Sequence, residues 1–154
     1  MPNWCQNVMY IKNATPKLRE AIEDGRLCDF IKPMPKELED TTSPSDGLNW
    51  YDWRVENWGT KWDINVPIVQ DDEDDTLVVT FDTAWGPPCE MWREMSKKFD
   101  FEAYFVEYGM MFFGSFIEGT EWSQEFPNGR YAPEDSDDYH GWVHPNAYLQ
   151  NVYS

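Results

Sequence analysis

The stretch TLVVTFDTAWGPPCEMWREMSKKFDFEAYFVEYG, residues 76–109, carries two strand patterns separated by one helix pattern. Alternation at its start groups Leu77, Val79 and Phe81 on one face of a strand. The proline pair in the middle opens a helix over residues 88–99, because a proline at the first helical position sacrifices no hydrogen bond. The run FEAYFVEYG then predicts a second strand. A strand, a helix and a strand in this order make one half of a split βαβ arrangement.

The chain before this stretch supplies the other half. Residues 3–11 are rich in residues that favour strands, and Thr15 begins a helical pattern that Gly25 ends. Residues 61–69 predict another strand, which pairs with the strand of residues 76–85 in a hairpin with an acidic tip.

The order of these elements is βαββαβ, and one more strand follows over residues 110–119. We therefore expect an α+β fold of the ferredoxin-like kind, with an antiparallel sheet and both main helices on one of its faces. Residues 1–119 form this domain, including an aromatic insertion over residues 26–60 with a short helix near its end. Residues 120–154 form an irregular, acidic and aromatic extension that docks on the domain. Three scattered cysteines cannot hold an iron–sulfur cluster, and no cofactor is expected.

The charge of the chain restricts its partners. Its 154 residues include 12 Lys and Arg against 29 Asp and Glu, a formal net charge of −17. This balance argues against direct binding of nucleic acid and against an anionic membrane surface, since both require basic patches. There is no secretory signal pattern and no long apolar segment, and the odd number of cysteines is typical of a reducing compartment. We expect a cytoplasmic protein.

Five short motifs resemble those of a known family. They are NWCQN (3–7), KPMP (32–35), NWGTKWD (57–63), TAWGPP (83–88) and EYGMMFFG (107–114). Together they resemble the Api92-like, or YubB-type, ferredoxin-like domain family of phages, prophages and conjugative plasmids, over about residues 2–118. The resemblance implies the same fold and a bacterial host cytoplasm, and it brings no catalytic residues. The acidic hairpin tip and the acidic tail are not marks of the family.

The acidic run at the hairpin tip is the sharpest electrostatic feature. Together with a second cluster in the tail, it predicts a surface that imitates the phosphates of nucleic acid and attracts a basic partner. The alternative is a solvated loop that only keeps the protein soluble. The acidic residues of this predicted surface are Asp71, Asp72, Glu73, Asp74, Asp75, Glu134, Asp135, Asp137 and Asp138.

Aromatic residues would anchor such a partner. We expect Trp50, Trp53 and Tyr139 to be exposed and to contact it. The function expected from charge and resemblance is a non-enzymatic binding protein that inhibits a nucleic-acid-handling defence protein of the host, of the restriction or CRISPR type. A third possibility is a structural or oligomerising domain.

A second function class uses a pocket under the tryptophan-rich insertion. Asn57, Lys61, Asp63 and Trp85 would line this pocket, which would bind a small ligand or carry an enzymatic site. Lys61 would then hold a phosphate or carboxylate, whereas in a purely structural role it would contact the neighbouring tryptophans.

Other sites are disfavoured by their own chemistry. The acidic run lacks the glycine and the glutamate that a calcium loop needs at positions six and twelve. His140 and His144 lie beside glycine and proline, which oppose the helix that would join them in a metal site. Cys89 lies at a helix start, where the dipole can lower a thiol pKa, but the sequence pairs it with no base.

Overall fold

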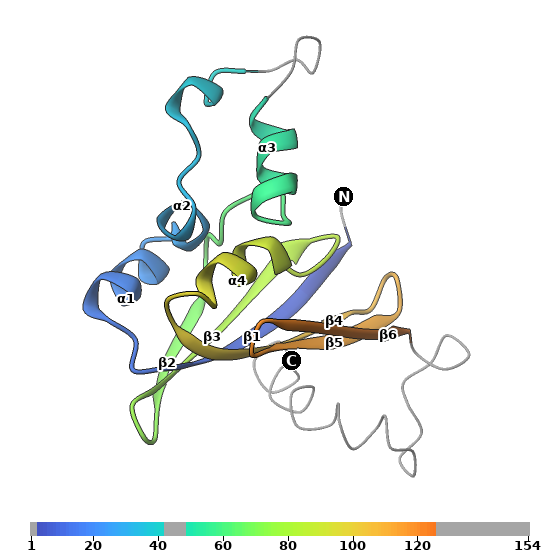
Figure 1. The fold of residues 1–154 in the computed structure, drawn as a ribbon. Coiled ribbons are helices and arrows are strands. Elements are labelled where there is room, and N and C mark those ends of the chain that lie inside the picture. The colour runs from blue at the N-terminus through green and yellow to red at the C-terminus, as the bar shows by residue number, and fades with distance from the viewer. Residues whose placement is uncertain (1–2, 42–48, 126–154) are drawn as a thin grey trace.

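The computed structural model describes residues 3–41 and 49–125 of the chain (Figure 1). In chain order the elements are β1 (Trp4–Lys12), α1 (Pro16–Glu23), α2 (Leu27–Ile31), the 3-10 helix η1 (Lys36–Leu38), α3 (Trp50–Asn57), β2 (Ile68–Asp72), β3 (Thr76–Ala84), α4 (Cys89–Met95), β4 (Asp100–Glu107), β5 (Phe112–Ile117) and β6 (Thr120–Glu125). The acidic cluster of the tail, Tyr139 and both histidines lie outside the described residues.

The strands form one sheet in the order β2-β3-β1-β4-β5-β6, and every neighbouring pair is antiparallel. Its first four strands have the arrangement of a split βαβ fold, in which each strand pair joined by a helix is separated by a strand of the other pair. The hairpin of β5 and β6 extends the sheet beyond β4. The predicted α+β, ferredoxin-like class is confirmed.

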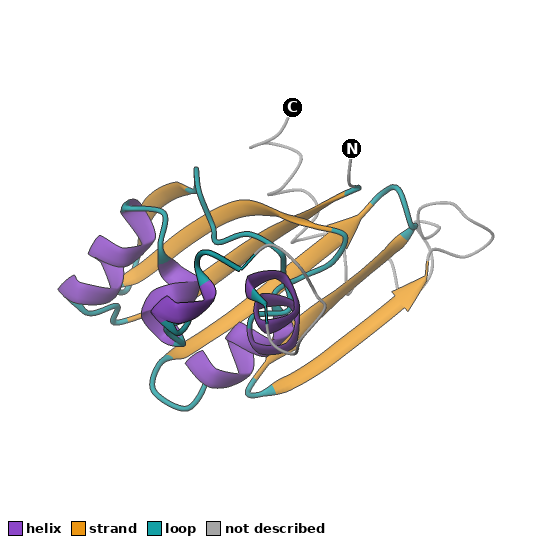
Figure 2. Cartoon of the chain, turned by 90° about the horizontal axis from the view of Figure 1, so that it is seen from above, coloured by secondary structure: helices purple, strands orange, loops and turns teal. Residues whose placement is uncertain are grey.

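The helices lie on one face of the sheet (Figure 2). Side chains of α1, α2, α3 and α4 pack there against alternate residues of the strands and form the main core. Trp92 of α4 is at its centre, with its ring centroid about 6 Å from those of Phe105 (6.3 Å) and Phe116 (5.8 Å). Its indole N–H donates to the sulfur of Met9 at 3.3 Å. The other face carries a smaller cluster around Val8 and Phe113.

The helix starts follow the capping chemistry of the sequence. The hydroxyl of Thr15 accepts a hydrogen bond from the backbone N–H of Leu18, and Pro16 occupies the first turn of α1. Asn49 caps α3 in the same way by accepting from the N–H of Asp52. The helix expected over residues 88–99 is shorter, because α4 ends at Met95.

The strand predicted from residue 61 is wrong over its first half. β2 begins only at Ile68, and residues 61–67 form irregular structure. Asp63 is held by the backbone of α2, which draws this segment towards the helices, and Pro67 lacks the N–H that a strand would use. The chain thus crosses from the helical layer to the sheet edge before it becomes a strand.

The irregular extension predicted from residue 120 is also wrong at its start. Thr120–Glu125 form β6, which pairs with β5 through a two-residue turn at Glu118 and Gly119. Both turn residues have positive φ, +51° and +78°, as the favoured two-residue hairpins require. The expected boundary at residue 119 therefore falls inside a hairpin. Within the described residues, the chain has no helix that is long and apolar enough to cross a membrane.

Candidate functional site

The sequence motifs meet at one end of the sheet, where buried polar contacts join them. The backbone N–H of Trp85 donates to the carbonyl of Asn3 at 2.8 Å, and that of Met91 donates to the carbonyl of Trp58 at 3.1 Å. The indole N–H of Trp58 donates to the carbonyl of Lys32 at 2.9 Å. These bonds join the first motif to the fourth and the second motif to the third, and they tie the third to α4, so the motif residues that form them have a structural role.

Glu107 and Asn7 are buried polar residues that sequence reasoning missed. The Glu107 carboxylate accepts from the N–H groups of Gly109 and Met110 at 2.7 and 2.8 Å, which fixes the turn after β4. The Asn7 amide donates to the Thr83 hydroxyl at 3.0 Å and to two strand carbonyls. Both residues stabilise turns and strand ends of the sheet.

A cleft of about 340 Å³ lies between α3 and the turn after β3, and we call it the Trp85 cleft. Its lining residues are Tyr51, Val55, Gly59, Thr60, Lys61, Ala84, Trp85 and Gly86. Tyr51 and Val55 are four residues apart on the exposed face of α3, so they lie side by side on one wall. Its volume is in the lower part of the range of small-molecule sites.

Trp85 forms the opposite wall in a strained conformation. Its φ is +72°, which is uncommon for a bulky residue, yet 55% of the side chain is exposed. Backbone bonds on both sides impose this conformation: Trp85 donates to Asn3, and the N–H of Gly86 donates to Ala84 at 2.9 Å. The hydroxyl of Thr83 also donates to the carbonyl of Gly86 at 2.6 Å. The fold therefore holds a large apolar side chain at the surface against its own conformational preference.

Lys61 supplies the positive charge of the cleft. Its ammonium nitrogen lies 4.6 Å from the ring centroid of Trp62 and 5.7 Å from that of Tyr51. Among the described residues no carboxylate forms an ion pair with Lys61. Cation–π contacts thus hold the ammonium group in place, and no described carboxylate compensates its charge.

Thr60 is buried between the Trp85 cleft and a second cavity, and it lines both. Its hydroxyl oxygen has no hydrogen-bond partner in the part of the chain that the structure describes. Buried hydroxyls are usually hydrogen-bonded, and leaving one unpaired costs stability. Thr60 is therefore a buried polar group that the described residues leave unpaired.

Asp63 lies on the far side of this segment and holds α2. Its carboxylate accepts from the N–H groups of Cys28 (2.8 Å), Asp29 (3.1 Å) and Ile64 (2.8 Å). Burial raises the pKa of Asp63 above its usual value, although the three hydrogen bonds act in the opposite direction. Asp63 lines the second cavity, of about 230 Å³, beside the stacked rings of Trp4 and Trp62.

The structure does not bring the four residues of the predicted pocket together in one cavity. Lys61 and Trp85 line the Trp85 cleft, while Asp63 lines the second cavity. Asn57 lines neither, because its side-chain amide turns back and donates to the carbonyl of Trp53 at 2.9 Å. Tyr51 and Thr60 were missed: helical spacing could not choose among neighbouring aromatics, and no local pattern reveals an unpaired buried hydroxyl.

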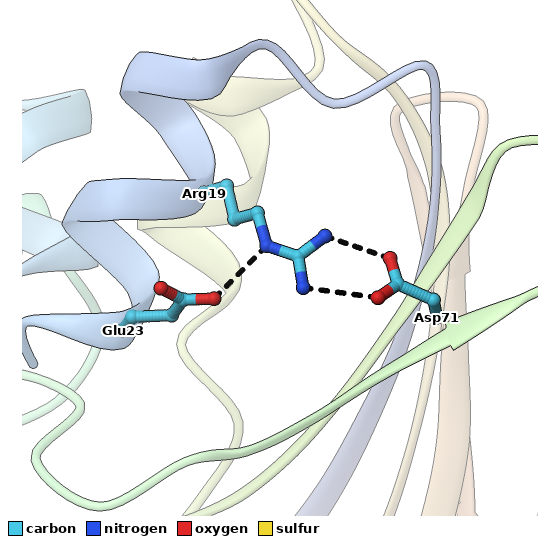
Figure 3. Close-up of polar contacts among 3 residues, drawn as sticks. All are labelled: Arg19, Glu23 and Asp71. Atoms are coloured by element: carbon cyan, nitrogen blue, oxygen red, sulfur yellow. Dashed lines mark hydrogen bonds and ion pairs between the residues drawn. The ribbon is translucent and has the colours of Figure 1, made fainter.

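The acidic run forms the other candidate site, which we call the acidic hairpin (residues 71–75). Asp71 accepts two hydrogen bonds from the guanidinium of Arg19, at 2.7 and 3.0 Å, and Arg19 also pairs with Glu23 (Figure 3). The hydrogen bonds from Arg19 hold the pKa of Asp71 below its usual value. The carboxylates of residues 72–75 are exposed and form no ion pair with any described residue.

The tip of the acidic hairpin has a defined backbone. Asp74 and Asp75 have φ of +58° and +55°, as in the tight turns that suit the twist of a hairpin. The N–H of Asn13 donates to the carbonyl of Asp75 at 2.9 Å and ties the tip to the end of β1. The carboxylates are therefore presented from a fixed scaffold.

The expected aromatic anchors on α3 need correction. Trp53 is only 8% exposed, because its ring packs edge-on against Trp58 in the core, and it cannot contact a partner. Trp50 is partly buried against the core, with the guanidinium of Arg54 5.1 Å from its ring centroid. Tyr51, between them in the chain, is the exposed aromatic residue of this helix.

No described group suggests nucleophilic or metal chemistry. Cys5, Cys28 and Cys89 are all buried free thiols. The lowered pKa considered for Cys89 is wrong, because burial and the nearby Glu121 carboxylate raise that pKa instead. Among residues 3–41 and 49–125, no group of three or more His, Cys, Asp or Glu could hold a metal ion.

The sheet order and the one-sided helices define an α+β protein of the ferredoxin-like class. The family model described as the ferredoxin-like domain in Api92-like protein matches residues 57–137, and the chain belongs to this family. The crystal structure of the protein api92 from Yersinia pseudotuberculosis is similar in fold, with a TM-score of 0.53 and 12% identity; the match covers 85% of this chain and 100% of that chain. No curated protein matches the chain.

Proposed function

We propose that this protein is a non-enzymatic binding protein that holds a basic, nucleic-acid-handling protein of a bacterial host through its acidic hairpin. By occupying the groove that normally receives nucleic acid, it would inhibit a defence system of the restriction or CRISPR type. We infer a bacterial host from the family resemblance to proteins of mobile elements. We infer a basic partner from the negative charge of the chain.

The observation that carries the proposal is the run of four consecutive exposed carboxylates at residues 72–75, none of which forms an ion pair with a described residue. Elsewhere in the described part some acids form ion pairs, such as Glu94 with Lys97 and Glu121 with Arg93, while isolated ones such as Glu56 form none. At the acidic hairpin, Arg19 takes up only the charge of Asp71. The four consecutive carboxylates that remain form a dense negative array, and duplex DNA likewise carries about one charge per 1.7 Å of its axis.

Apolar side chains on the same edge of the sheet would add short-range packing contacts to this electrostatic attraction. β2 is the outermost strand on its side of the described sheet. Val66, just before β2, is 92% exposed, and Ile68 at its start is 41% exposed. Charges at a rim speed association, whereas buried apolar anchors slow dissociation. An edge of this composition fits a partner with an apolar spot beside a basic groove.

A competing explanation is that the acids protect the exposed edge of β2 from pairing with other chains. The experiment must therefore separate the position of the charge from its amount. A hairpin variant, D72N/E73Q/D74N/D75N, removes four negative charges and leaves the Asp71 pair intact. A control variant, E37Q/E39Q/D40N/E56Q, removes four exposed charges from η1, the turn after it and α3.

The three proteins would be immobilised and exposed to nuclease-treated bacterial lysate, and captured proteins eluted by a salt gradient. We expect the wild type and the control to retain the same basic protein, with the hairpin variant retaining at least about tenfold less. Equal capture by both variants would overturn the proposal. Aggregation of the hairpin variant alone, with capture unchanged, would assign the acids to edge protection.

A separate measurement tests whether the protein blocks the binding of nucleic acid by its partner. The captured protein is purified and bound to a fluorescent DNA duplex, and each of the three proteins is then added. We expect displacement of the duplex by the wild type and the control, but not by the hairpin variant. A partner that keeps its duplex in the presence of wild type would contradict mimicry.

A further inference from the structure

We propose that the Trp85 cleft binds a small organic anion that carries a flat ring. The site is separate from the acidic hairpin, and the inference does not depend on the proposed function. It is carried by the hydroxyl of Thr60 and the charge of Lys61, neither of which has a partner among the described residues, and by the strained, exposed residue Trp85.

The charge of the ligand follows from Lys61. Lys61 is the only charged residue among the described residues that line the cleft, and it forms no ion pair with a described carboxylate. Its position over the rings of Trp62 and Tyr51 restrains it before any ligand arrives. A preorganised cation loses little entropy when it binds a carboxylate or phosphate, and the resulting contact is a strong, charge-assisted one.

The aromatic walls of the cleft indicate that the ligand carries a flat ring. Tyr51 and Trp85 are both about half exposed and line the cleft from opposite elements, with Val55 and Ala84 beside them. Aromatic side chains of this kind bind planar groups by stacking or edge contacts. The strain at Trp85 supports this reading, because the conformation costs stability, and the indole is too exposed to repay the cost by packing in the core.

One polar group on the ligand follows from Thr60. The residue is only 2% exposed and lines the cleft, and its hydroxyl has no hydrogen-bond partner among the described residues. A hydroxyl can donate and accept, so it would satisfy a ring nitrogen, a ring N–H or an ether oxygen. A site with one buried hydrogen-bonding group rejects analogues that lack the matching group.

The overall charge of the protein does not prevent anion binding. At about 0.15 M ionic strength the Debye length is about 8 Å, so distant carboxylates are largely screened at the cleft. A cleft of about 340 Å³ accepts one or two rings with a short substituent. Aromatic carboxylates and nucleoside monophosphates share this chemistry, and the experiment distinguishes the two.

The probes are indole-3-acetate and AMP, each paired with its uncharged counterpart, indole-3-acetamide and adenosine. Binding is followed by NMR through the indole N–H signal of Trp85, which is assigned by its absence in Trp85→Phe. We expect one anion to give a saturable shift of this signal and to bind at least about tenfold more tightly than its uncharged counterpart. The anion that does so identifies the source of the ligand chemistry.

Two variants test the named contacts. Lys61→Met should weaken anion binding at least about tenfold and abolish the preference for the anion, while Lys36→Met, at an exposed lysine of η1, leaves both unchanged. Thr60→Val keeps the side-chain shape and should weaken binding several-fold without lowering the unfolding midpoint, because the hydroxyl has no partner among the described residues. That combination separates a ligand contact from a structural one.

Three results would overturn the inference. The first is the absence of a saturable shift with either anion up to about 10 mM, above the range of specific affinities. The second is equal binding of the anion and its uncharged counterpart. The third is unchanged anion affinity in Lys61→Met when the variant is folded.

Discussion

The dipeptide Trp-Gly occurs in two motifs of this protein, and the fold treats the two copies in opposite ways. Trp58 is 1% exposed, and Gly59 after it has a φ of +81° that ends α3. In the second copy, Trp85 is 55% exposed and itself has the positive φ, while nothing lies within 4 Å of a Cβ added to Gly86. The first tryptophan belongs to the core and the second to the surface.

The difference separates the residues that build this end of the sheet from the residues that are free to bind. Trp58 donates to Lys32 and accepts from Met91, so it joins the insertion to α4. Trp85 uses only its backbone for structure, and its side chain is left in the cleft. A surface side chain that the fold does not need is the kind of group that a ligand or partner can use.

The largest expected effect is the loss of the buried tryptophan. Trp58→Ala should lower the free energy of unfolding by about 3–5 kcal/mol, because it leaves a cavity and removes a buried hydrogen bond. Trp85→Ala should lower it by less than about 1 kcal/mol, as expected for a surface side chain. Urea unfolding of both variants measures the two values, and similar losses would show that Trp85 is part of the core.

Substitution of Gly59 and Gly86, the glycines that follow the two tryptophans, should show the same contrast in stability with smaller effects. A Cβ at Gly59 would lie 3.2 Å from the backbone nitrogens of Cys89 and Glu90, and the left-handed conformation adds to the strain. We expect Gly59→Ala to cost about 2 kcal/mol. Gly86→Ala is the matched control and should change stability by no more than about 0.5 kcal/mol. Equal effects of the two substitutions would contradict the asymmetry.

The sequence predicts the fold well where apolar residues alternate strongly. The patterns of β1, β3 and β4 and the caps at Thr15 and Asn49 lie within short stretches of chain. β6 was missed because five of its six residues are exposed and the sixth is the polar Gln124, so the sequence pattern shows no buried face. Residues 61–67 predict a strand because apolar and polar residues alternate along them. In the structure this segment is irregular and crosses from the helical layer to the sheet edge.

The sequence predicts the candidate site less well, since burial there depends on distant segments. Lys61 and Trp85 were singled out from their neighbours, and they do line one cleft. Asp63 was placed with them, yet its carboxylate is used by the backbone of α2. Thr60 could not be chosen, because an unpaired hydroxyl is defined by what surrounds it in space.

Asp63 gives a pH-dependent test that distinguishes it from the cleft residues. Its pKa in the folded protein is raised by burial, so the folded state binds its proton more tightly than the unfolded state does. Its contribution to stability is therefore present below the usual carboxyl range and is lost as pH rises through the raised pKa. Asp63→Asn removes this dependence.

The measurement is the free energy of unfolding of wild type and Asp63→Asn at a series of pH values from about 4 to 7, spanning the carboxyl range and above. We expect the wild-type value, relative to that of the variant, to fall with rising pH. A relative value that rises instead would mean that the three N–H groups outweigh desolvation at this carboxylate.

The smallest expected effect tests the strain at Trp85 directly. Trp85→Ala and Trp85→Gly remove the same indole contacts, but alanine keeps the Cβ at a φ of +72° and glycine does not. In ordinary helix or strand positions glycine is less stable than alanine by about 0.5–1 kcal/mol. Here we expect the reverse order by about 1 kcal/mol in urea unfolding, because the left-handed conformation penalises any Cβ. The usual order would mean that the turn relaxes once the indole is gone, and that the side chain, rather than the surrounding hydrogen bonds, maintains the conformation that presents it.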